Sequence, residues 1–172
     1  PAVVTALVDY ALNADRPDIV RATALDDLQG LNDKELLGKL QTALSDPNPL
    51  IRASGAHVVH GLDPAIRIPF VKPLLSDPVR AVRQAAATEL LGADLTTLSA
   101  TEKANFDRAF GEYRDLRQAT SDTPESQMAI AGLALSQRDW PKAEAGFETA
   151  LTMDPQLETA WLTLSRLKAA LG

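Results

Sequence analysis

Hydrophobic residues recur at intervals of three and four along most of the chain, which is the spacing of amphipathic helices rather than of strands. In the first half the whole pattern of apolar, small and polar positions returns with a fixed 31-residue period. The corresponding apolar positions include Val20, Ile51 and Val82, and also Leu28, Val59 and Leu90. A fixed period of this length is typical of stacked helical units. We therefore predict an all-α fold, a right-handed α-solenoid of antiparallel helix pairs.

Three columns of the 31-residue repeat are identical in every unit. They are Asp15, Asp46 and Asp77; Arg21, Arg52 and Arg83; and Gly30, Gly61 and Gly92. Asp46-Pro47 and Asp77-Pro78 supply an N-cap oxygen and a proline suited to the first helical position, and each glycine supplies a helix stop. The interval from cap to glycine predicts a first helix of roughly four turns in each unit.

A second helix is predicted after each glycine. Apolar residues mark it at Leu36, Leu37, Leu40 and Leu44 in one unit, and at Ile68, Val71, Leu74 and Leu75 in the next. Residues 2–13 fall in the second-helix slot of an earlier unit. The repeats are therefore expected to span residues 1–98, as about three units of which the first is truncated.

The segment from Asp77 to Ala86, with the pattern D-P-x-x-x-V-R-x-x-A, resembles a HEAT repeat of the short bacterial type. In that family the aspartate and arginine form a ladder between neighbouring units. The resemblance therefore implies a structural ladder through Asp46, Arg52, Asp77 and Arg83, begun by Asp15 and Arg21. The alternative is that the arginines receive an anionic ligand, but a repeated aspartate beside a repeated arginine favours mutual pairing.

Beyond Gly92 the period is lost, and residues 99–119 are predicted to form one longer helix within a linking segment, 99–122. Ser99 and Glu102 form a capping box at its start. Phe106, Phe110, Tyr113 and Leu116 form one apolar stripe. The stripe is interpreted as core packing, with a partner-binding ridge as the alternative.

Residues 123–172 form the last predicted domain. Within residues 124–157 the residues Ile130, Ala131, Ala143, Phe147, Ala150 and Pro155 share one 34-residue frame that resembles a tetratricopeptide repeat. Trp161, Leu164 and Ser165 restart the same frame, and the helix that carries them is expected to act as a cap. Small alanines would let two antiparallel helices approach closely.

The tetratricopeptide resemblance implies a concave, peptide-binding face. The positions that line it are Glu125, Met128, Gly132, Leu135, Ser136, Thr159, Leu162 and Arg166. They lack the paired basic clamp that some of these repeats use for a C-terminal carboxylate. The alternative is that this unit packs on the HEAT-like part and binds nothing.

Composition narrows the possible chemistry. The net charge is -6 and no run of Lys or Arg occurs, which argues against nucleic-acid binding. The chain has no cysteine, so it has no disulfide, thiolate nucleophile or CxxCH haem attachment. No apolar run is long enough for a membrane span. We expect a protein or peptide partner, no cofactor and no membrane insertion, and the oligomeric state is left open.

Catalytic and metal-binding patterns are weak. His57 and His60 are the only histidines, spaced i and i+3 on a predicted helix, and no fixed third ligand accompanies them. No GxSxG or phosphate loop occurs, and Asp26-Asp27 is interpreted as solvated surface charge. The HEAT-like repeats also resemble those of bilin-chromophore lyases, but the absence of cysteine weakens that alternative. We predict a non-catalytic scaffold for protein interaction, with no metal site.

The order of HEAT-like units, linking helix and tetratricopeptide-like unit also resembles the C-terminal region of bacterial multihaem c-type cytochromes. That resemblance implies an alternative role as the non-haem arm of a periplasmic electron-transfer protein that docks a redox partner. Without it, a cytoplasmic location is expected. Because the pattern begins inside a repeat, the chain is expected to be part of a longer protein.

Overall fold

The computed structural model describes residues 2–119 and 121–171. Within these ranges it contains ten α-helices, two short 3-10 helices and no strand. The chain divides into two compact units, Pro1–Phe110 and Gly111–Gly172, and the division falls inside α7 (Ala100–Ala119). The linking segment predicted at 99–122 is thus shared between the units. The predicted all-α solenoid is confirmed.

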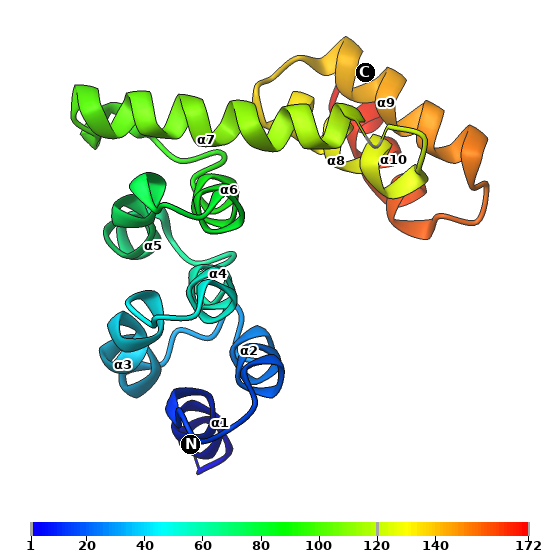
Figure 1. Ribbon diagram of the computed structural model, residues 1–172. Helices are drawn as coiled ribbons and strands as arrows, with labels where there is room; N and C mark the ends of the chain where they lie inside the picture. Colours follow the sequence, from blue (N-terminus) through cyan, green and yellow to red (C-terminus); the bar gives the residue numbers. More distant parts are fainter. Residues whose placement is uncertain (1, 120, 172) are drawn as a thin grey trace. The chain divides into compact units, whose positions relative to one another are not determined.

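The first unit is a stack of helix pairs. In Figure 1 the first helices of the repeats form one column and the second helices form another. The first helices are α2 (Asp18–Asp26), α4 (Pro49–His57) and α6 (Arg80–Glu89), and the second helices are α1 (Ala2–Leu12), α3 (Lys34–Leu44) and α5 (Pro64–Val71). Leucine, isoleucine and valine side chains fill the space between the columns, among them the fully buried Leu28, Leu36, Ile51, Leu75, Val82 and Leu90.

The repeated glycines stand in the turns that follow the first helices, three or four residues beyond the last helical residue. Gly30, Gly61 and Gly92 all have a positive φ. Their backbones lie in the left-handed region that only glycine enters without strain. The helices before them are shorter than the four turns predicted, because α2 and α4 have nine residues each and α6 has ten. A turn occupies the residues between each helix end and its glycine.

The helix starts also differ from the prediction. Asp46 and Asp77 are not N-caps, because α4 begins at Pro49 with Asn48 as its cap, and α6 begins at Arg80. The aspartates instead accept a hydrogen bond from the backbone N–H two residues later, at 2.8 Å in both cases. This local turn uses the side-chain oxygen before the helix begins.

The second helix of the repeat that spans residues 46–76 is broken. The predicted apolar series continues from α5 into a 3-10 helix, η1 (Lys72–Ser76). Pro73 has no N–H to donate to the carbonyl of Pro69, so the α-helical hydrogen bonds stop there. A further 3-10 turn, η2 (Leu95–Thr97), leads to α7.

Helix α7 starts at the predicted capping box, with reciprocal bonds between Ser99 and Glu102 at 2.8 and 3.3 Å. The aromatic stripe is buried only in its first half. Phe106 and Phe110 stack with ring centroids 5.5 Å apart, whereas Leu116 is exposed.

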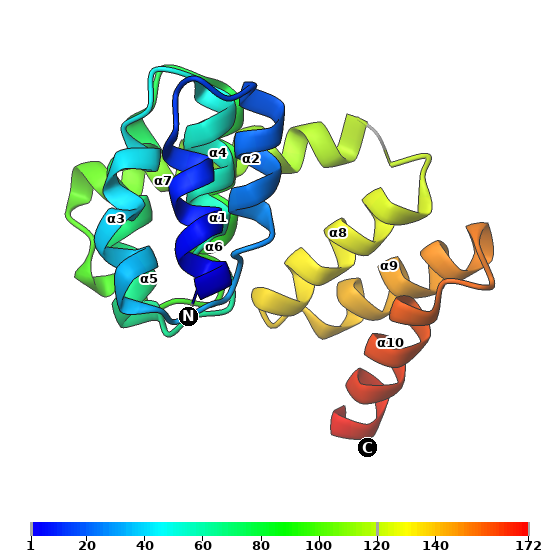
Figure 2. The same cartoon turned by 90° about the horizontal axis from the view of Figure 1, so that it is seen from below.

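The second unit contains α8 (Pro124–Ser136), α9 (Trp140–Met153) and α10 (Glu158–Leu171). Figure 2 shows α8 and α9 lying side by side, joined by a short turn in which Arg138 has a positive φ. The core is built from small and apolar residues: Ala131, Ala134, Ala143, Phe147, Leu151, Ala160, Leu164 and Leu167. A Cβ added at Gly146 would lie 2.8 Å from the Cβ of Ala131, so these two helices meet at a position where only glycine fits.

Candidate functional site

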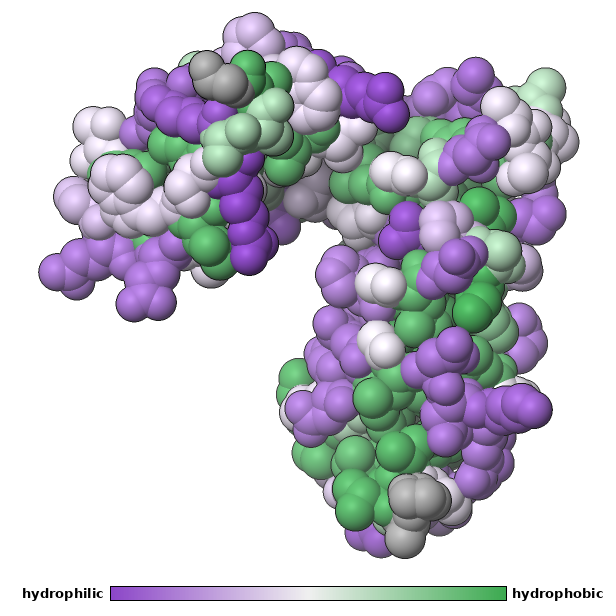
Figure 3. Space-filling model, turned by 180° about the vertical axis from the view of Figure 1, so that it is seen from behind, coloured by the Kyte–Doolittle hydropathy of each residue, from purple (hydrophilic) through white to green (hydrophobic). Residues whose placement is uncertain are grey.

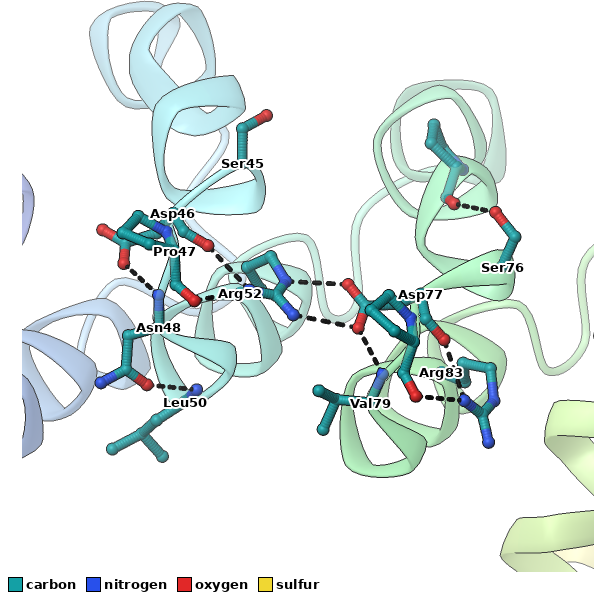
Figure 4. Close-up of polar contacts among 12 residues, drawn as sticks. Ser45, Asp46, Pro47, Asn48, Leu50, Arg52, Ser76, Asp77, Val79 and Arg83 are labelled. Atoms are coloured by element: carbon teal, nitrogen blue, oxygen red, sulfur yellow. Dashed lines mark hydrogen bonds and ion pairs between the residues drawn. The ribbon is translucent and has the colours of Figure 1, made fainter.

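The repeated polar columns of the first unit meet at the starts of its first helices. Figure 4 shows Arg52 of α4 extended toward Asp77 of the next repeat. Its Nε donates to Asp77 Oδ2 at 2.8 Å and its Nη2 to Oδ1 at 3.0 Å, which makes a bidentate pair. Its Nη1 donates to the carbonyl oxygens of Asp46 and Pro47 at 2.8 and 3.1 Å. One arginine therefore links two repeats and also holds its own N-terminal turn.

The preceding rung has the same 25-residue interval between arginine and aspartate. Arg21 donates through Nη2 to Asp46 and through Nη1 to Asp18, the latter at 3.0 Å. Its Nε donates to the carbonyl oxygen of Ala11 at 2.9 Å. The Arg21 side chain is 4% exposed, so this guanidinium is a buried charge whose donors are occupied by protein groups.

The two ends of the predicted ladder differ from these rungs. Among the described residues the guanidinium of Arg21 contacts Asp18 and Asp46 but not Asp15, which is exposed and precedes the first arginine. At the other end Arg83 donates through Nη1 to the carbonyl oxygens of Asp77 and Pro78, at 2.9 and 3.0 Å. It thereby repeats the contact that Arg52 makes inside its own unit.

The ladder changes the acidity of its members. Burial by itself would raise the pKa of Asp77. The hydrogen bonds from Arg52 and from the Val79 N–H, with the positive charges of Arg52 and Arg83, outweigh burial and hold that pKa below its usual value. The hydrogen bond to Asp77 likewise raises the pKa of Arg52 despite burial. The guanidinium groups of Arg21 and Arg52 each meet a carboxylate of the next repeat, so these two arginines have little attraction left for an anionic ligand.

One polar cluster of the first unit was missed by the sequence reasoning. Glu89 at the end of α6 is 3% exposed, and its two carboxylate oxygens contact the Nδ1 atoms of His57 and His60 at 2.9 and 3.0 Å. The sequence did contain a signal, because Glu89 stands in the same repeat column as Val58, which is fully buried. A carboxylate at a core position needs partners, and the two histidines one repeat earlier supply them.

The eight residues expected to line a concave face all lie on α8 or α10. None of them is buried. Glu125, Ser136, Thr159, Leu162 and Arg166 are exposed or partly exposed, and Met128, Gly132 and Leu135 are half-buried. Met128 and Leu135 pack against the core of the unit, whereas Leu162 is 52% exposed. A Cβ added at Gly132 would meet no atom within 4 Å, so the surface there is open.

The surface of the first unit is also partly apolar. Figure 3 shows hydrophobic side chains gathered in a band over its helices, with hydrophilic ones on either side. The large apolar side chains that remain exposed in this unit are Val3, Ile19, Val20, Leu31 and Leu50. Exposed apolar surface of this kind is suited to contact with another protein.

The described residues contain no group of three or more His, Cys, Asp or Glu side chains suited to hold a metal ion. None of the helices in that part of the chain is long and apolar enough to cross a membrane.

Comparison with known proteins adds one match. The family model for HEAT repeats matches residues 4–92, which is just over half of the chain. No curated protein and no solved structure matches significantly. The match gives no support to the expected resemblances to tetratricopeptide repeats and multihaem cytochromes. It does cover the 31-residue helix pairs and both complete rungs of the ladder, and the chain belongs to the HEAT-repeat family.

Proposed function

We propose that this protein is a non-catalytic scaffold that binds a partner polypeptide on the exposed face of α8 and α10. HEAT repeats commonly serve as protein-interaction scaffolds, and the family is typically non-catalytic. In this proposal the ladder keeps the first unit in a fixed shape, and the last three helices, with the packing of a tetratricopeptide-like unit, present the binding residues.

The observation that carries the proposal is the apolar exposure of Leu162 on α10. Half of its side chain (52%) faces solvent, although Leu164 and Leu167 of the same helix are buried in the core of the unit. On α8 the open surface at Gly132 would let a polypeptide backbone approach closely. On either side of Gly132 along α8, Met128 and Leu135 would offer half-buried apolar side chains to the bound polypeptide.

The polar positions of the face favour a peptide over a small anion. Glu125 and Arg166 carry opposite charges, and Ser136 and Thr159 add hydroxyl groups. A face that mixes apolar anchors with single polar groups suits an extended or helical peptide that contributes both kinds of contact. A lone arginine without a second cation gives no clamp for a phosphate or a carboxylate.

The proposal can be tested with a random peptide library displayed on phage. Peptides selected on the wild-type chain would be synthesised and titrated by fluorescence anisotropy against Met128→Glu plus Leu162→Glu. We expect affinity to fall at least about tenfold, because two charges would be placed against apolar ligand groups.

Met153→Glu plus Leu171→Glu is the matched control. Both residues are exposed and apolar, at 43% and 51%, and the pair adds the same charge away from the expected face. Equal affinity of the selected peptides for all three proteins would refute binding through α8 and α10. Selection of no peptide above background would also count against the proposal.

A further inference from the structure

The contact between α4 and α6 contains a buried carboxylate that the fold itself does not require. The repeat places Asp27, Val58 and Glu89 in one column. Asp27 is exposed, Val58 is fully buried, and Glu89 is 3% exposed. Val58 shows that an apolar side chain satisfies this core position, so Glu89 introduces a charge where the neighbouring repeat has none.

Both histidines of the chain contact this carboxylate. His57 Nδ1 lies 2.9 Å from Oε1 and His60 Nδ1 lies 3.0 Å from Oε2. The rings reach out to solvent, with side chains 37% and 67% exposed. Protons can therefore reach the cluster from water, while the charge they would neutralise is buried between two repeats.

The protonation states differ in the charge they leave at the α4 and α6 contact. When both rings are neutral, each can donate its Nδ1–H to Glu89, but the cluster retains one buried negative charge. When one ring is protonated, the cluster becomes a neutral ion pair with the same hydrogen bonds. A buried charge with no counter-charge is the less stable arrangement.

We infer that the His57, Glu89 and His60 cluster makes the coupling between two consecutive HEAT repeats depend on pH, with α4 and α6 held more tightly as pH falls from about 8 to 6. Because each repeat of a solenoid contacts only its neighbours, a change at one interface alters the stability and shape of the stack locally. The inference concerns the first unit and does not depend on peptide binding by α8 and α10.

The pKa of His57 changes in the required direction. The hydrogen bond to Glu89 raises it, burial opposes this, and the charges of Glu89 and of Asp26 raise it further. A histidine with a raised pKa in the folded state adds stability that is complete below the pKa of the unfolded chain, near 6.5. This stability is lost as pH rises through the higher pKa of the folded state.

The other charged groups on the surrounding elements support this direction or are engaged elsewhere. On α2, Asp26 favours the protonated form of His57. On α3, Lys39 is held in ion pairs with carboxylates of α1 and α3. On α5, Arg67 donates to the carbonyl oxygen of Leu91, and on η1, Lys72 pairs with a carboxylate of α7.

The equivalent contact between α2 and α4 is an internal control. In that contact Asp26 and Gln29 take the repeat positions of His57 and His60, and Val58 takes the repeat position of Glu89. That set contains no histidine. The second unit, residues 111–172, has no histidine at all and is a further control.

Hydrogen exchange followed by mass spectrometry at pH 6 and pH 8, corrected for intrinsic exchange rates, tests the inference on the full chain. Amides of α4 and α6 should open less often at pH 6, by about tenfold for each unit by which the pKa of His57 is raised. Amides of α8 to α10 should show no such change. In Glu89→Gln, which keeps an acceptor oxygen but removes the charge, the pH dependence should disappear.

Three outcomes would overturn the inference: the same pH dependence in Glu89→Gln, no difference between pH 6 and 8 in the wild type, or an equal change in the second unit. If Glu89→Gln does not fold, Glu89→Val replaces it, because valine occupies the same column one repeat earlier. An NMR titration of the wild-type imidazoles gives an independent result. A His57 pKa at or below about 6.5 would refute the mechanism.

Discussion

Replacing Arg52 with alanine should destabilise the first unit far more than the loss of one surface ion pair would. The substitution removes two donors to Asp77 and two to backbone carbonyls, and it leaves the Asp77 carboxylate, 7% exposed, with the N–H of Val79 as a remaining partner. Breaking one side of a buried pair costs about 3–5 kcal/mol. Because Arg52 itself is 13% exposed, water can partly replace it, and we expect a loss of about 2–4 kcal/mol.

Lys39→Ala is the matched control for Arg52→Ala. Lys39 also contacts two carboxylates, Asp9 and Glu35, at 2.9 and 3.0 Å, but its side chain is 40% exposed. Ion pairs of similar length contribute little to stability when they are exposed to solvent, because water and salt screen the charges. Burial and not the number of contacts should therefore decide the outcome.

Hydrogen exchange is the suitable assay for Arg52→Ala, because two units need not unfold in one step. Protection should fall in residues 15–92 and stay nearly unchanged in residues 124–171. An equal loss in both ranges would refute the nearest-neighbour reasoning and favour one cooperative globule. A loss no larger than that of Lys39→Ala would refute the importance of the ladder.

The stability lost in Arg52→Ala should also depend on pH. The pKa of Asp77 lies below its usual value, because the contacts of Arg52 and Val79 outweigh burial. A lowered pKa adds stability that is complete above the pKa of the unfolded chain, about 3.9, and is lost as pH falls through the pKa of the folded state. The difference between the wild type and Arg52→Ala should therefore be constant from pH 5 to 8 and shrink below about pH 4.

Two pairs of glycine substitutions test the backbone, each measured by urea denaturation. Gly61 has a positive φ, although no atom obstructs a new Cβ there. Gly61→Ala should therefore destabilise by about 1 kcal/mol. Gly38→Ala, inside α3, should instead stabilise by about 0.5–1 kcal/mol. Gly146→Ala should destabilise the second unit by about 1–3 kcal/mol, because its Cβ would press on Ala131. Gly132→Ala has free space and should be neutral or stabilising. Equal effects within either pair would contradict these explanations.

The helix pairs and their phase could be predicted from the sequence because the signals are local and repeated. A glycine that must adopt a positive φ marks the turn that follows a helix without any knowledge of the tertiary structure. The starts of the helices were less predictable. At Asp46 and Asp77 the side chain can cap a helix or close a turn before it, and in the structure it closes the turn while an arginine six residues later holds the carbonyl oxygen of the same aspartate.

The missed residue, Glu89, illustrates a different limit. Its partners His57 and His60 lie 32 and 29 positions earlier, intervals that match neither the 31-residue repeat nor the turn of a helix. Contacts across a repeat interface depend on how the two helices are rotated against each other, which sequence spacing does not specify. The ladder interval of 25 residues is equally unmarked by the period, and those contacts were expected because the repeated aspartates and arginines resemble the HEAT-repeat pattern.

In a solenoid, comparison of repeats can distinguish residues that build the fold from residues that do something further. A column that is apolar and buried in successive units, such as Ile51 and Val82, is explained by packing alone. A column that changes from Val58 to a buried Glu89 is not, because the valine shows that packing needs no charge there. Keeping a carboxylate in such a place has a desolvation cost, so its two histidine partners are where a functional property of the repeats is to be sought.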